Sequence, residues 1–114
     1  MKRLSAWWVL TLLCTFSIFA QNKGITVSGR VIESDSQEPA AQATVQLLSL
    51  PDSAYAAGIA SSNKGWFTLP KVKAGKYILK VSYIGFRTKF VPVQLSNNVT
   101  EKKMGNISLD PDAV

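Results

Sequence analysis

The chain has 114 residues, of which 46% are hydrophobic and 18% charged, and its formal net charge is +6. That length allows one ordinary domain, and it excludes a multidomain enzyme and a complete large membrane barrel. The sequence has no histidine and one cysteine, Cys14, which excludes a Ser-His-Asp or Cys-His centre and the usual zinc sites. We therefore expect a small folded domain that is not an enzyme and that needs no cofactor or metal.

Residues 1–20 have the features of a secretory signal peptide. Two basic residues, Lys2 and Arg3, precede an uncharged apolar run over residues 4–20. We expect cleavage after Ala20 and an exported product. The alternative is a retained anchor, because the run reaches the short end of the roughly 17–25 residues that span a membrane.

Removal of this leader changes the charge and the redox chemistry of the chain. The net charge falls from +6 to +4 when Lys2 and Arg3 are lost. This mild, dispersed charge predicts no binding of nucleic acid. Cys14 leaves with the leader, so the mature domain has no disulfide. Leu13 before Cys14 is too large for a lipoprotein site, so we expect no lipid anchor.

The first half of the mature chain predicts three strands. Residues 25–31 alternate apolar and polar side chains, which is typical of a half-buried strand. A polar turn over 33–39 separates them from a second strand at 43–47, where Leu48 and Leu50 suggest a far end covered on both faces. Residues 55–61 form a weaker strand candidate, with a short helix as the alternative.

The second half predicts four more strands. A turn at 61–65, with Asn63 and Gly65 suited to positive φ, leads to a short strand at 66–69 that Pro70 ends. The clearest strand covers 76–83, with Tyr77, Leu79, Val81 and Tyr83 on its inner face. Two further strands are predicted, one at 86–95 with an edge or bulge position at Pro92 and one at 99–109 with a bulge at Gly105. A linker or tail follows at 110–114.

About seven short strands separated by turns predict an antiparallel β-sandwich. A two-residue turn at Ile84 and Gly85 would place Tyr83 opposite Phe86, Val81 opposite Thr88 and Leu79 opposite Phe90.

The same register gathers basic side chains on the outer face. It pairs Ser82 with Arg87 and Lys80 with Lys89, near Lys76. One interpretation is a basic strip for an acidic partner or for lipid headgroups. The other, which we favour, is a set of solvated lysines that deter pairing between sheet edges.

Two further groups are candidates for a binding site. Trp66 and Tyr77 could stack on a sugar ring, although an aromatic side chain in a strand more often belongs to the core. Glu33, Asp35 and Glu38 share one loop, but they lack the spacing and the glycine of a calcium-binding EF-hand, so we interpret this loop as a solvated turn.

Several motifs in series carry a resemblance to a known family. These are Gly29-Arg30-Val31, Glu38-Pro39, residues 43–47, Asn63-Lys64-Gly65-Trp66-Phe67, residues 75–81 and Tyr83-Ile84-Gly85-Phe86. Together they resemble the carboxypeptidase regulatory-like domain, over about residues 24–109. The resemblance implies a seven-stranded transthyretin-like sandwich, also described as a carbohydrate-binding-like fold, in a domain at 21–109 that is not catalytic.

A signal peptide directly before such a domain is similar to the N-terminal extension of TonB-dependent outer-membrane receptors of Bacteroidetes-like bacteria. Residues 45–48 with Asp52 and Ser53 resemble a segment typical of those proteins. The resemblance implies an accessory module in the periplasm or at the outer membrane of a Gram-negative bacterium. Its partners would be a receptor plug and barrel, in the same or a partner chain, or a periplasmic protein. The alternative is an exported domain that stands alone and binds a carbohydrate or a peptide.

Overall fold

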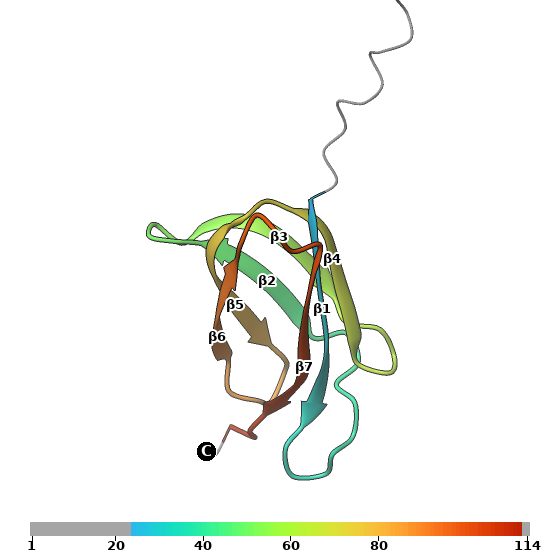
Figure 1. The fold of residues 1–114 in the computed structure, drawn as a ribbon. Helices are drawn as coiled ribbons and strands as arrows, with labels where there is room; N and C mark the ends of the chain where they lie inside the picture. The colour runs from blue at the N-terminus through green and yellow to red at the C-terminus, as the bar shows by residue number, and fades with distance from the viewer. Residues whose placement is uncertain (1–23, 113–114) are drawn as a thin grey trace, which may run out of the picture.

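The computed structural model describes residues 24–112, which fold into two β-sheets packed face to face (Figure 1). The predicted leader, with its cleavage position after Ala20, lies outside the described residues. The seven strands are β1 (Ile25–Glu33), β2 (Thr44–Ser49), β3 (Ala54–Ala60), β4 (Trp66–Val72), β5 (Gly75–Ser82), β6 (Lys89–Leu95) and β7 (Glu101–Leu109).

The sheets contain three and four strands. The first has the order β4-β1-β7 and the second the order β3-β2-β5-β6. The predicted seven-stranded, transthyretin-like sandwich is thereby confirmed. It differs from a wholly antiparallel sandwich in one pair, because β7 runs parallel to β1. The chain crosses between the sheets after β6, so β7 enters the three-stranded sheet beside β1 in the same direction.

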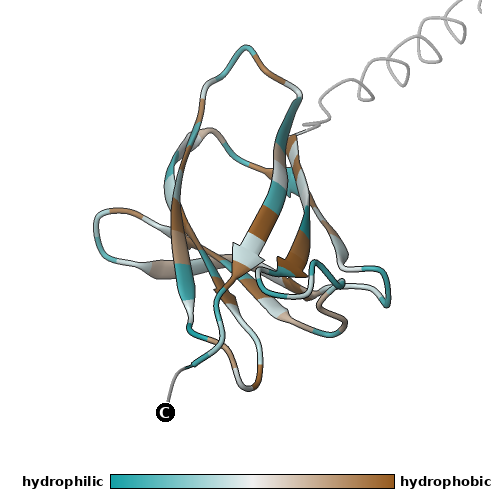
Figure 2. Cartoon of the chain, turned by 90° about the horizontal axis from the view of Figure 1, so that it is seen from below, coloured by the Kyte–Doolittle hydropathy of each residue, from teal (hydrophilic) through white to brown (hydrophobic). Residues whose placement is uncertain are grey.

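The core lies between the two sheets and is built from alternate residues of the strands. Figure 2 shows polar and apolar positions alternating along the strands. Val27 and Val31 of β1 and Leu79 and Val81 of β5 are fully buried, as the two-residue period predicts. Tyr83 is only half-buried and packs against the margin of this core.

The register of β5 with β6 differs from the predicted one by a single residue. Val81 lies opposite Lys89 and Leu79 lies opposite Val91, whereas the sequence predicted Thr88 and Phe90 at these places. The prediction assumed a two-residue turn, but the connection runs over 83–88. Tyr83 does meet Phe86, with ring centroids 5.3 Å apart. The pair belongs to the connection, where the Phe86 N–H donates to the Tyr83 carbonyl.

The residues after β5 are held by the end of the chain. The Arg87 N–H donates to the Asp110 carbonyl, and the Asp112 N–H donates to the Gly85 carbonyl. The isolated bridge between Phe86 and Pro111 continues this contact. Residues 110–112, expected to begin a linker or tail, therefore dock on the β5–β6 connection.

Three local expectations are corrected. Strand β4 continues past Pro70 to Val72, because Pro70 and Lys71 form a bulge in an edge strand, where proline removes no ladder hydrogen bond. The far end of β2 is not covered on both faces, because Leu50 is exposed. In the turn before β4, positive φ is found at Gly65 and not at Asn63.

Gly65 shows why that turn requires glycine. Its φ is 84°, and a Cβ there would meet the carbonyl oxygen of Val31. In the same turn the Val31 N–H donates to the Gly65 carbonyl at 2.8 Å. This hydrogen bond fixes the start of β4 beside β1. The predicted bulge at Gly105 is confirmed by the shift of register opposite Ser28 and Arg30.

Candidate interaction surface

The four cations proposed as a basic strip do not share one face. Lys76 and Lys80 both lie on the outer face of β5, as alternation predicts. Lys80 lies opposite Phe90 and not opposite Lys89. Lys89 instead reaches the other sheet, where its Nζ donates to the Ser108 carbonyl at 3.0 Å. Arg87 lies in the β5–β6 connection. The outer face of the four-stranded sheet thus keeps two of the four cations.

Trp66 and Tyr77 have opposite environments. The Trp66 side chain is 54% exposed at the start of β4, and the guanidinium carbon of Arg30 lies 5.3 Å from its ring centroid. The Nε of Arg30 donates to the Lys64 carbonyl at 2.9 Å, which holds the cation beside the ring. Tyr77 is buried, and its hydroxyl donates to the Lys73 carbonyl at 2.7 Å. Of these two aromatic residues, Trp66 alone offers a face to a ligand.

The acidic loop is folded on itself. The Ser36 hydroxyl donates to Glu33 Oε1, the Ser36 N–H donates to Asp35 Oδ1, and the Glu38 N–H donates to Ser36 Oγ. Within residues 24–112, no group of three histidine, cysteine or acidic side chains is arranged to hold a metal ion. The same part of the chain has no helix that is long and apolar enough to cross a membrane.

An apolar row on the outer face of the four-stranded sheet was missed by the sequence analysis. Tyr55 lies opposite Leu48, Leu48 opposite Ile78, and Ile78 opposite Pro92, so the row crosses all four strands. Tyr55 is 65% exposed. Phe90, which lies on the same outer face of β6 two residues before Pro92, is 58% exposed. The signal lies in the register between strands, because each strand alone contributes one or two ordinary surface residues.

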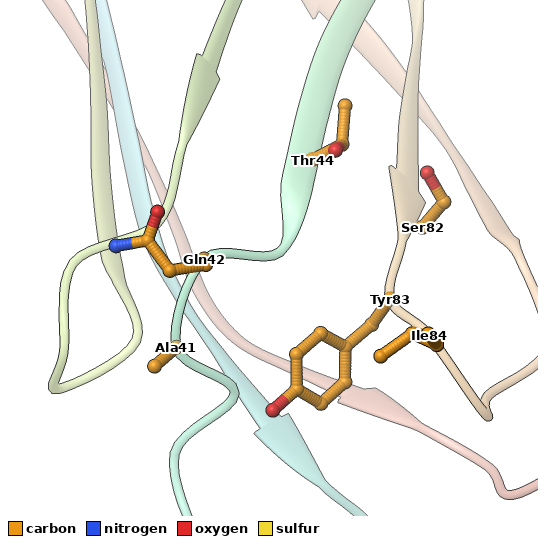
Figure 3. Close-up of a pocket in the computed structure, with 6 residues that line it drawn as sticks. All are labelled: Ala41, Gln42, Thr44, Ser82, Tyr83 and Ile84. Carbon is orange, nitrogen blue, oxygen red and sulfur yellow. The ribbon is translucent and has the colours of Figure 1, made fainter.

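A hollow of about 550 Å³ lies at one end of the four-stranded sheet. Figure 3 shows Thr44 and Ser82 on two strands above the ring of Tyr83, with Gln42, Ala41 and Ile84 completing the wall. Thr44 and Ser82 are directly opposite each other in the β2–β5 pair. The hollow offers hydroxyl and amide groups for hydrogen bonds and an aromatic ring for contact, which suits binding by contact.

The fold and these surfaces define a small transthyretin-like β-sandwich that exposes sheet faces, sheet edges and shallow hollows. The model of the carboxypeptidase regulatory-like domain matches residues 26–110. The chain therefore belongs to the carboxypeptidase regulatory-like domain family, as its motifs predicted. This family has a non-catalytic regulatory and interaction fold. A search of curated proteins finds no match to the sequence.

Solved structures with the same fold come from several functional classes. The group B streptococcus pilus 2b backbone protein matches with a TM-score of 0.61 and 11% identity, over 79% of this chain and 42% of that chain. The 5-hydroxyisourate hydrolase of Klebsiella pneumoniae matches with a TM-score of 0.58 and 16% identity, over 78% and 92%. A cohesin–X-dockerin complex from Acetivibrio cellulolyticus matches with a TM-score of 0.55 and 20% identity, over 73% and 53%.

These likenesses are at identities that show the fold alone. The chain spans less than half of the pilus protein and about half of the matched chain in the cohesin complex. One of these neighbours is a hydrolase, one is a pilus backbone protein and one is part of a cohesin complex.

Proposed function

We propose that this protein is a non-catalytic interaction module of an exported uptake system, the accessory domain of a TonB-dependent outer-membrane receptor. The observation that carries the interaction role is membership of the carboxypeptidase regulatory-like family, together with an apolar row on the outer face of the four-stranded sheet whose ends, Tyr55 and Pro92, are exposed. A sandwich whose exposed features are sheet faces and edges recognises partners by contact. Two of the structural neighbours, a pilus backbone protein and a cohesin complex, are themselves parts of protein assemblies.

The receptor context is supported by the order of segments in the sequence. A leader-like run at residues 1–20 stands directly before the domain, which is how the N-terminal extensions of these receptors are arranged. In this proposal the module lies in the periplasm or at the outer membrane of a Gram-negative bacterium. Its partners are a receptor plug and barrel, in the same or a partner chain, or a periplasmic protein.

The test uses the gene in its own organism. The reading frame beyond Val114 and the neighbouring genes are sequenced for a plug and barrel, and residues 24–112 are then deleted with the leader kept. We expect nutrient uptake to fall while the amount of receptor in the outer membrane is unchanged, because the module acts by contact. Uptake at the wild-type rate, or a product found in the cytosol, would contradict the proposal.

A second candidate, an exported domain that binds a carbohydrate, is favoured by one observation. Trp66 is half-exposed beside Arg30, and an exposed indole can stack on a sugar ring. A glycan array on the leaderless chain tests this, with Trp66→Ala as the variant and Phe90→Ala as a control that removes an exposed aromatic ring elsewhere. Glycan binding lost in Trp66→Ala and kept in Phe90→Ala would favour this candidate over the receptor module.

A further inference from the structure

Three of the four edge strands carry features that discourage pairing with another strand. Natural sheets protect their edges with charged residues, prolines and bulges. Strand β6 contains Lys89 and Pro92, and β7 begins with Glu101 and two lysines before its bulge at Gly105. Strand β4 contains Pro70 within a bulge.

Strand β3 is the exception among the four edges. Its seven residues, Ala54–Ala60, include no charged residue and no proline, and it lies at the border of the four-stranded sheet beside β2 (Figure 1). All of its residues except Ala57 are exposed. An uncharged, exposed edge of this length favours the addition of another strand.

The backbone of β3 offers unpaired hydrogen-bonding groups at this edge. The Ser61 N–H donates to the Ala43 carbonyl, so Ser61 faces β2. Antiparallel pairing alternates, so Ala60 and Gly58 direct their N–H and C=O groups away from β2. Within residues 24–112, neither has a backbone partner outside the sheet ladder. Repeated donors and acceptors of this kind are matched by an extended polypeptide.

The outer side of this edge has room for apolar side chains. A hollow of about 210 Å³ is lined by Tyr55, Gly58, Ile59 and Ala60 together with residues of β2. The hydroxyl of Tyr55 lies 2.8 Å from the place that a Cβ of residue 58 would occupy. The Tyr55 ring therefore packs over Gly58, where a larger residue would clash with it, and it forms one wall of this hollow.

The inner side of this edge is basic. A second hollow, of about 230 Å³, lies between β3 and β4 and is lined by Ala56, Ala57, Pro70, Lys71, Lys73 and Tyr77 among others. Both lysines are exposed, and no acidic residue lines this hollow. Asp52 lies at the far start of β3, where its Oδ1 accepts from the Ala54 N–H at 3.4 Å.

We propose that the β3 edge binds an extended segment of a partner protein whose side chains alternate between apolar and acidic. The added strand pairs with Gly58 and Ala60, its apolar side chains pack against Tyr55, and its acidic side chains face Lys71 and Lys73. A second copy of this chain fits less well, because β3 contributes no acid and each copy brings its own two lysines. This inference rests on the proposed interaction role and names the surface and the partner for it.

The first experiment measures peptide binding to the leaderless chain by amide hydrogen exchange and calorimetry. The probes are two capped heptapeptides, TVEVEVT and TVKVKVT. We expect TVEVEVT to slow exchange at the Gly58 and Ala60 amides and to bind about tenfold more tightly than TVKVKVT, because it forms two exposed ion pairs where the other peptide meets two like charges. No slowing at these two amides, or equal affinity for the two peptides, would overturn the proposal.

Matched variants separate the edge from the general charge of the domain. Ala60→Lys places a charge on the β3 edge, and Gln94→Lys places the same charge on β6, the opposite edge of the same sheet. Binding of TVEVEVT should fall about tenfold or more in Ala60→Lys and be unchanged in Gln94→Lys. The thermal midpoints of both variants should match the wild type, because both positions are exposed. Lys73→Glu should remove most of the preference between the two peptides, because one cation and one anion then face the added strand.

Two outcomes distinguish this inference from the proposed function. If deletion of residues 24–112 abolishes uptake while Ala60→Lys keeps it, the interaction role stands and the β3 edge is not its surface. If protection of Gly58 and Ala60 rises with protein concentration and needs no peptide, the occupant is a second copy and the acidic partner is wrong.

Discussion

Among residues 24–112, Ser61 is the one polar residue in the buried set, and it joins two segments through its hydroxyl. The Ser61 Oγ donates to the Ala40 carbonyl at 2.6 Å and accepts from the Ala43 N–H at 2.9 Å. These bonds satisfy two backbone groups of the segment that enters β2. They also fix the end of β3 beside it, which places the β3 edge.

Replacement of Ser61 by alanine should therefore destabilise the domain. Ser61→Ala leaves the Ala43 N–H and the Ala40 carbonyl buried without this partner, which costs about 1–3 kcal/mol of the free energy of unfolding. Urea unfolding measures the loss. Ser62→Ala is the control, because Ser62 is exposed and its Oγ accepts from backbone N–H groups in a solvated turn. Equal losses in the two variants would contradict this account.

Leu79 tests the assignment of faces on β5. It is fully buried, opposite Leu47 on one side and Val91 on the other. A carboxylate there has no partner, so Leu79→Asp should abolish cooperative folding. Lys80→Asp, one residue along on the outer face, should keep a cooperative transition. Thermal unfolding of both variants is followed by circular dichroism. A soluble, cooperatively folded Leu79→Asp variant would show that the inner face is misassigned.

At the scale of the elements, the register of β6 decides which of its residues support the core. Leu95 is buried, whereas Phe90 is 58% exposed. We expect Leu95→Ala to lower the free energy of unfolding by about 2–5 kcal/mol, and Phe90→Ala by about 0.5 kcal/mol or less. Denaturant titration of both variants checks this. A larger loss in Phe90→Ala would favour the register that places Phe90 opposite Leu79.

Alternation along one strand was sufficient to predict β1 and β5. In β5 the inward positions of Tyr77, Leu79 and Val81 were predicted correctly, because a half-buried strand repeats every two residues, whereas Tyr83 lies beyond the strand and is only half-buried. Alternation also placed Lys76 and Lys80 on one outer face. These predictions need no knowledge of a second strand.

Features that depend on two strands were not predictable in this way. The register of β6 failed because the sequence Ile84-Gly85 suggested a tight turn, while residues 110–112 hold the connection in a wider path. The same contact separates Arg87 from the expected strip. The apolar row from Tyr55 to Pro92 needs three registers at once, and the unprotected edge at β3 needs the strand order of the whole sheet.

At the scale of the whole molecule, the domain depends on the pairing of its first and last strands. Strand β7 is the neighbour of β1 on the side opposite to β4, and its Ile107 and Leu109 are buried in the core. The series of about seven short strands and turns predicted a sandwich, and the family resemblance implied its transthyretin-like form. Neither the alternation nor the family resemblance predicted the direction of β7, because alternation is the same for parallel and antiparallel pairs.

A chain truncated after Thr100 should therefore not fold. It keeps six strands, but β1 loses its β7 neighbour and the core loses Ile107 and Leu109, each worth about 1.5–3 kcal/mol of burial. Since small domains are stable by only about 5–15 kcal/mol, we expect no thermal transition in circular dichroism. The matched control ends after Asp112, which keeps the contacts of 110–112. A cooperative transition in the shorter chain would show that β7 is dispensable.

The parallel pairing of β1 and β7 also determines how the domain responds to tension. Because the two strands point the same way, a pull on the start of β1 and on the end of β7 slides one along the other. All hydrogen bonds of the pair are then loaded in shear at the same time, and they do not break one after another. A domain held at both ends of its chain would therefore resist extension through the whole β1–β7 pair.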